Sequence, residues 1–80
     1  MRIEFTKQSD AQAFADRIHA WMLANDVNYA TSVAAGQTKA WCVPYQQKDI
    51  NGTVTNPAWC VNVKDRCMAA LTPSEMASVK

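Results

Sequence analysis

Hydrophobic and polar residues alternate at the start of the chain and then change to a helical period. Residues 2–6 place Ile3 and Phe5 on one side and charged or polar side chains on the other, which predicts a strand with one solvated face. From residue 10 to residue 24 apolar positions recur every three or four residues, which predicts an amphipathic helix with an N-cap at Ser9. The apolar face of this helix would comprise Ala11, Phe14, Ala15, Ile18, Trp21 and Met22.

The next segment returns to alternation. Residues 27–33 alternate in polarity, which predicts a second strand. Residues 34–37 supply a turn, in which Gly36 is available for a positive φ. A third strand is predicted over residues 38–45, and it ends or bulges at Pro44, which has no amide hydrogen to donate to a ladder.

A tetrapeptide, Ala-Trp-Cys-Val, occurs at residues 40–43 and again at residues 58–61. Its aromatic and β-branched residues favour strands. Between the two copies lies Asn51-Gly52, a pair that favours the positive φ values of a tight hairpin. We therefore predict that residues 38–45 pair antiparallel with a fourth strand over residues 58–63.

The register of this predicted hairpin decides the surroundings of two tryptophans. A two-residue turn at Asn51-Gly52 pairs Pro44 with Trp59 and places Trp41 on the opposite face. A directly paired or even register places Trp41 and Trp59 on the same face. The sequence leaves both registers open.

Two short helices are predicted after the hairpin. Residues 65–71 are rich in helix formers. Thr72 then stands as N-cap, Pro73 at the first helical position and Glu75 at the capping-box position, which predicts a last helix to about residue 79. The predicted fold class is α+β, a four-stranded, mostly antiparallel sheet with one long helix on a face and short C-terminal helices, in the order β-α-β-β-β-α.

Size and composition predict one domain over residues 1–80. A chain of 80 residues lies close to the lower size limit for a self-sufficient core. Large aliphatic residues are scarce and alanine is abundant, so a homo-oligomer is one way for the chain to bury more apolar surface.

Charge and hydropathy limit the kinds of partner that the chain is expected to bind. The net charge is only +1 and the basic residues are scattered, which makes nucleic acid a less favoured partner. No apolar run reaches the length of a signal peptide or a membrane span, so we expect a cytoplasmic protein that does not bind membranes. Its three cysteines, Cys42, Cys60 and Cys67, are expected to be reduced thiols.

No group of residues in the sequence predicts catalysis. The three cysteines and His19 reach the ligand count of a zinc site, but they lack the short spacing of a zinc knuckle. Asp16 and His19 form a carboxylate–imidazole pair one helical turn apart, a spacing at which such pairs often occur without a catalytic role. We therefore expect His19 to be solvated. Two glycines do not make a phosphate-binding loop. We therefore predict a protein that is not an enzyme and holds neither metal nor cofactor.

The remaining hypothesis is a small protein-binding domain that acts on a host or cognate protein. A small chain without motifs is typical of an accessory protein of a phage or mobile element. Such a viral protein would bind and inhibit a host factor. The alternative is a single-stranded nucleic-acid or nucleotide-binding module that stacks bases on Trp41 or Tyr45 and meets phosphates with Lys39, Lys48 and Lys64. Pro44 and Pro57 interrupt the predicted hairpin, so its edge and loop form the predicted binding surface: Trp41, Tyr45, Gln47, Lys48 and Asn56.

Overall fold

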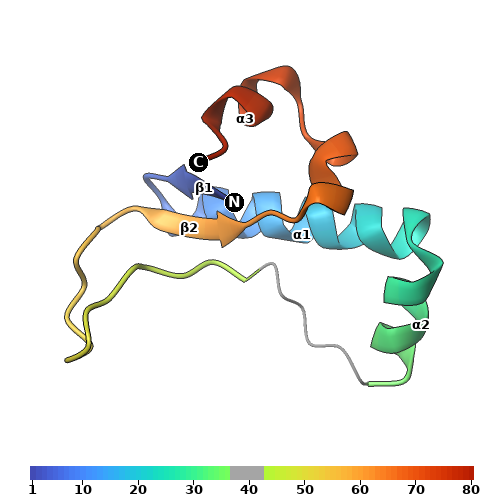
Figure 1. The fold of residues 1–80 in the computed structure, drawn as a ribbon, viewed down its shortest axis with the longest axis horizontal. Coiled ribbons are helices and arrows are strands. Elements are labelled where there is room, and N and C mark those ends of the chain that lie inside the picture. Colours follow the sequence, from blue (N-terminus) through green and yellow to red (C-terminus); the bar gives the residue numbers. More distant parts are fainter. Residues whose placement is uncertain (37–42) are drawn as a thin grey trace.

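The computed structural model describes residues 1–36 and 43–80. Two short strands and a long helix form its centre, and shorter helices lie at two sides (Figure 1). In chain order the elements are β1 (Arg2–Phe5), α1 (Gln8–Asn25), α2 (Val27–Ala34), β2 (Trp59–Asn62), the 3-10 helix η1 (Asp65–Ala70) and α3 (Pro73–Ser78).

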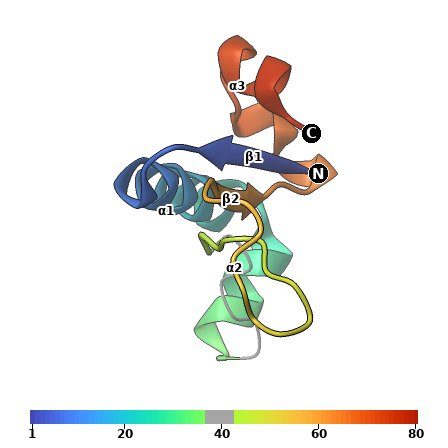
Figure 2. The ribbon, with the colours of Figure 1, turned by 90° about the vertical axis from the view of Figure 1, so that its left-hand side faces the viewer.

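The sheet pairs β1 antiparallel with β2, and α1 packs along it (Figure 2). Ile3 stands opposite Val61, and Phe5 stands opposite Trp59. Ile3 and Val61 are almost completely buried, whereas Trp59 is half-buried against the core. Residues two apart on a strand share a face, so the side of the sheet that carries Ile3 and Phe5 faces the core.

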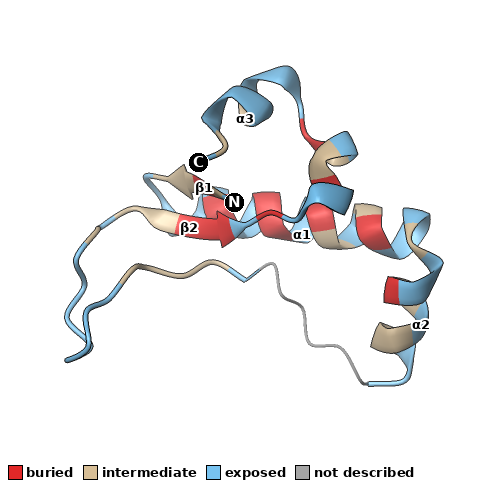
Figure 3. Ribbon diagram, viewed as in Figure 1, coloured by how far each residue is buried: buried red, intermediate tan, exposed pale blue. Residues whose placement is uncertain are grey.

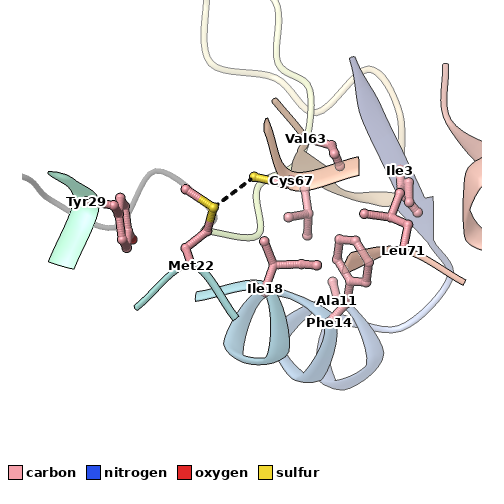
Figure 4. Packing of buried hydrophobic residues seen from close by; sticks show 11 residues of the cluster. Ile3, Ala11, Phe14, Ile18, Met22, Tyr29, Val63, Cys67 and Leu71 are labelled. Carbon is pink, nitrogen blue, oxygen red and sulfur yellow. Dashed lines mark hydrogen bonds between the residues drawn. The ribbon is translucent and has the colours of Figure 1, made fainter. Parts of the chain in front are cut away.

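The core is built mainly on α1, and the buried residues follow its inner face (Figure 3). In Figure 4, Phe14 and Ile18 of α1 point toward side chains of β1 and of the segment after β2. The thiol of Cys67 lies 3.6 Å from the sulfur of Met22. The buried cluster comprises Ile3, Ala11, Phe14, Ala15, Ile18, Met22, Tyr29, Val61, Val63, Cys67 and Leu71.

The predicted long helix is confirmed, but its predicted N-cap is wrong. The helix begins at Gln8, and Lys7 is the N-cap residue, without a side-chain capping bond. The first helical hydrogen bond runs from the amide of Ala11 to the carbonyl of Lys7. β1 ends at Phe5, so Ser9 already lies inside the first turn of the helix.

The prediction of a four-stranded sheet is wrong, because the sheet of the described residues has two strands. Residues 27–33, predicted as a strand, lie in helix α2. The Asp26 side chain caps this helix by accepting a hydrogen bond from the Tyr29 amide at 3.0 Å. Tyr29 and Val33 pack against the core, whereas Val27 is 80% exposed. Residues 29 and 33 are four positions apart, a spacing that places them on one face of either a strand or a helix. The hydrogen-bonded cap at Asp26 favours the helix.

The predicted strand over residues 38–45 lies only partly within the described residues. Residues 37–42, which include Trp41 and Cys42, lie outside them. Tyr45 forms an isolated antiparallel bridge with Cys60, with N···O distances of 2.9 and 2.7 Å. This bridge does not fit the register of a two-residue turn, which would pair Pro44 with Trp59, and the principal partner of β2 is β1.

The capping box of the last helix is confirmed. The Thr72 hydroxyl accepts from the Glu75 amide at 3.3 Å, and the Glu75 carboxylate accepts from the Thr72 amide at 2.8 Å. Glu75 also forms an ion pair with Arg17, which joins α3 to α1. Beyond α3, Lys80 exchanges two backbone hydrogen bonds with Arg2, at 2.8 and 3.0 Å, beside β1.

Replacing the cap residue of α2 tests why this segment is helical. Asp26 caps α2 and also forms an ion pair with Arg66 at 3.0 Å. We expect Asp26→Ala to lower the midpoint of urea unfolding and to reduce helical circular dichroism. Asp26→Asn should keep most of the stability, because Asn caps as well as Asp but cannot form the ion pair. Equal losses in the two variants would assign the effect to the ion pair and not to the cap.

Candidate functional site

Residues 45–60 form a hairpin that leaves the body of the protein beside β2 (Figure 1). The bridge between Tyr45 and Cys60 closes its base, and a second bridge, between Lys48 and Val54, lies near its tip. A backbone hydrogen bond from Thr55 to Gln47, at 2.9 Å, supports the second bridge. The hairpin is therefore ordered by its own hydrogen bonds.

The tip of the hairpin is a turn built on Asp49 and Gly52. The Gly52 amide donates to the Asp49 carbonyl at 3.0 Å, and the Asp49 amide donates to the Thr53 carbonyl at 2.9 Å. The Asp49 carboxylate accepts from the amides of Asn51 and Thr53, at 2.9 and 3.0 Å. Gly52 has a φ of +83°, as a three-residue hairpin loop ending in a left-handed glycine requires. The turn therefore lies where the Asn-Gly pair predicts it, but it is a three-residue loop and not the two-residue turn centred on Asn51-Gly52.

One arm of the hairpin bulges around Asn56. Lys48 lies three residues after Tyr45, whereas Cys60 lies six residues after Val54, so the second arm holds the extra residues. The Asn56 side-chain nitrogen donates to Gln47 at 3.3 Å, and its oxygen accepts from the Ala58 amide at 3.0 Å. Asn56 therefore fixes the shape of the bulge.

A charged cluster around Glu4 attaches the hairpin to the sheet. The Glu4 carboxylate accepts a hydrogen bond from Asn56 at 3.1 Å and forms ion pairs with Lys80 at 3.1 Å and Arg2 at 3.4 Å. The hydrogen bond from Asn56, together with that from Lys80, holds the pKa of Glu4 below its ordinary value. One carboxylate thus joins β1, the hairpin and the residues after α3.

Four of the five predicted site residues lie in the hairpin, and Trp41 lies outside the described residues. Asn56 and Gln47 bind each other, so both support the hairpin. Tyr45 is half-buried, and its hydroxyl donates to Asn62 of β2 at 2.8 Å. Lys48 is exposed. Of these four residues, Lys48 has the side chain most available to a partner.

Sequence reasoning missed two exposed apolar residues near the tip. Ile50 is 99% exposed, and Val54, opposite Lys48, is 42% exposed. A signal for Ile50 existed, because it lies in the segment Asp49–Thr53 that the Asn-Gly pair predicts as a turn, where a large aliphatic side chain cannot reach the core.

The thiols and the histidine of the described residues occupy structural positions. Cys60 and Cys67 are buried free cysteines, and burial raises the pKa of both thiols. A thiol with a raised pKa is mostly protonated near neutral pH and is a weak nucleophile. His19, predicted to be solvated, is half-buried and has its Nδ1 2.8 Å from the Tyr29 hydroxyl, whereas Asp16 accepts from Gln12.

Across residues 1–36 and 43–80, no group of three or more His, Cys, Asp or Glu side chains could hold a metal ion. A hollow of about 230 Å³ beside the bulge, lined by Thr6, Asn56, Pro57 and Ala58, is smaller than most small-molecule sites. No helix in these two segments is long and apolar enough to cross a bilayer.

Comparison with protein-family models, with curated proteins and with solved structures finds no match to the chain.

The Glu4 cluster predicts a pH dependence of stability. Because the folded state lowers the pKa of Glu4, its contribution is present above about pH 4.3, the ordinary pKa of Glu, and is lost as the pH falls below it. We expect the free energy of unfolding to fall between pH 6 and pH 3, and to fall less steeply in Glu4→Gln. Urea unfolding at the two pH values measures this.

Asp10→Asn, a change at an exposed carboxylate of α1, is the control and should leave the wild-type fall largely intact. If wild type and Glu4→Gln lost the same stability on acidification, the cluster would not be the source of the pH dependence.

Proposed function

We propose that the chain is a small protein-binding domain that recognises a protein partner through the hairpin. The observation that supports this most is that the hairpin has an ordered backbone although its residues are not buried. None of the residues 43–58 is buried, yet two bridges and a closed turn fix residues 45–60. Ordering a backbone costs conformational entropy, and within residues 43–58 no buried core residue offsets the cost. A contact outside the chain explains such an element, since ordered surface loops commonly carry binding residues.

The shape of the hairpin supports a protein partner over a small ligand. It projects from the body as a convex loop, which extends to the lower left in Figure 1 and is seen as an open loop in Figure 2. Small-molecule sites are concave and surround their ligand, whereas a projecting loop is itself the part that enters another surface. The exposed side chains near its tip are Lys48, Ile50 and Val54, a mixture of one charge and two aliphatic groups.

Three further expectations stay predictions. The first is that the partner is a host factor inhibited by a protein of a phage or mobile element, and the second is the absence of enzyme activity. The third is the alternative of single-stranded nucleic-acid binding, for which Trp41 and Lys39 lie outside the described residues. A steep loss of binding with added salt would favour that alternative.

A pair of matched variants tests the proposed surface. The hairpin variant, Lys48→Glu with Val54→Lys, reverses the charge at position 48, replaces an exposed apolar side chain with a charged one, and places opposite charges across the bridge. The control variant, Lys64→Glu with Val27→Lys, makes the same two changes at exposed positions outside the hairpin. Each tagged protein is used for affinity capture from a nuclease-treated bacterial lysate over a salt series.

We expect wild type and control to retain the same protein partner, and the hairpin variant to retain at least roughly tenfold less, as loss of a major interface contact would cause. Far-UV circular dichroism and melting temperature should agree among the three proteins. Retention of the partner by the hairpin variant, or capture of nuclease-sensitive material alone, would contradict the proposal.

A further inference from the structure

Ile50 is a large aliphatic residue at a turn position that does not require one. Its side chain is 99% exposed, the highest value among the large hydrophobic residues that the structure describes. It occupies the first central position of the turn that Asp49 and Gly52 close, a position that most residue types tolerate and proline favours. The turn therefore requires Gly52, whose φ is +83°, and uses the Asp49 carboxylate, but it requires nothing of Ile50.

The turn presents Ile50 from a fixed backbone. The Asp49 carboxylate accepts two hydrogen bonds from backbone amides, and two further hydrogen bonds join backbone groups, so that residues 49–53 are held in place. A side chain on a backbone that is already ordered loses less entropy when it binds, so more of the free energy of burying an aliphatic group appears as affinity.

The surroundings of Ile50 indicate the shape of the surface that would receive it. The residues that follow it, Asn51, Gly52 and Thr53, are small. Apart from Gly52 and its two chain neighbours, no heavy atom of the described residues lies within 4 Å of the position that a Cβ on Gly52 would occupy. Such a narrow tip can enter a concave pocket, whereas a flat surface would cover little of it.

Charge near the tip adds a second requirement. Lys48 is exposed, and no carboxylate in the described residues lies within ion-pair distance of it. The nearby Asp49 carboxylate is already engaged by the amides of Asn51 and Thr53. A carboxylate of a partner would therefore find Lys48 available.

We infer that Ile50 is the anchor by which the hairpin docks, and that its partner is a protein with a concave apolar pocket for one branched aliphatic side chain and a carboxylate at the rim. The inference deepens the proposed function and rests on it. Few residues carry most of the energy in protein interfaces, and they fill well-packed, desolvated pockets.

Photocrosslinking tests the anchor even while the partner is unidentified. A diazirine-bearing aliphatic amino acid is placed at position 50, at position 48 or, as the matched control, at position 27, where Val27 is 80% exposed. Each protein is illuminated in a nuclease-treated bacterial lysate, and adducts are mapped by mass spectrometry. We expect the probe at position 50 to insert into apolar residues that line a concavity of one protein, and the probe at position 27 to react with water.

The possible results separate the two claims. Adducts from position 48, with only water addition at position 50, would overturn the anchor and leave the hairpin as a binding surface. Water addition at both positions would overturn the anchor and the proposed function together. Equal protein adducts at positions 50 and 27 would show nonspecific contact and would also overturn the anchor.

The affinity of Ile50 and Val27 variants for the crosslinked protein then measures how much Ile50 contributes to binding. Ile50→Ala should raise Kd by at least about thirtyfold, and Ile50→Val by about fourfold, as the loss of one methylene predicts. Val27→Ala should leave Kd within about twofold, and all three variants should keep the wild-type melting temperature, because both positions are exposed. A change of less than about threefold for Ile50→Ala would contradict an anchor role.

Discussion

The antiparallel pairing of β1 with β2 is the constraint on which the rest of the structure depends. It joins Arg2–Phe5 to Trp59–Asn62, and so closes the chain around α1 and α2. Ile3 and Val61 face each other in the core, and Val63 extends the pairing by donating to Met1 at 2.9 Å. η1 and α3 follow directly after β2, so the same pairing delivers Cys67 and Leu71 to the cluster on α1.

This pairing also places the hairpin. Glu4 lies in β1 on the side of the sheet opposite the residues that face the core, opposite Cys60 in the register. Its carboxylate reaches Asn56 of the hairpin bulge, and the backbone of Cys60 holds Tyr45 at the hairpin base. The inner face of the β1–β2 pair is buried in the core. Its other face and the free edge of β2 orient the hairpin, whose tip exposes Ile50. Core and candidate binding surface are linked through a few residues of β1 and β2.

Sequence reasoning succeeded where structure is decided locally. The face of α1 repeats over several turns, and the capping box of Thr72 and Glu75 lies within four residues. The position of the turn at Gly52 was also predicted, because it needs a left-handed glycine, although its loop has three residues and not two. Sequence reasoning failed where distant segments compete. Two copies of one tetrapeptide suggested a hairpin partner for Trp59–Asn62, but β1 offers Ile3 and Phe5, which can share a core face with Val61 and Trp59. The binding surface was found only in part, because the turn that exposes Ile50 was identified but Ile50 itself was not assigned to the surface.

Cross-strand contacts in solution test the central pairing most directly. Because Val63 donates to Met1, the pairs Arg2–Asn62 and Glu4–Cys60 are the closely spaced, non-hydrogen-bonded pairs of the β1–β2 ladder. Their Hα atoms should therefore give strong nuclear Overhauser effects in an NMR spectrum. Their absence, with Hα contacts from Cys60 and Asn62 to residues 38–45 in their place, would contradict the account and restore the hairpin pairing that the repeated tetrapeptide predicts.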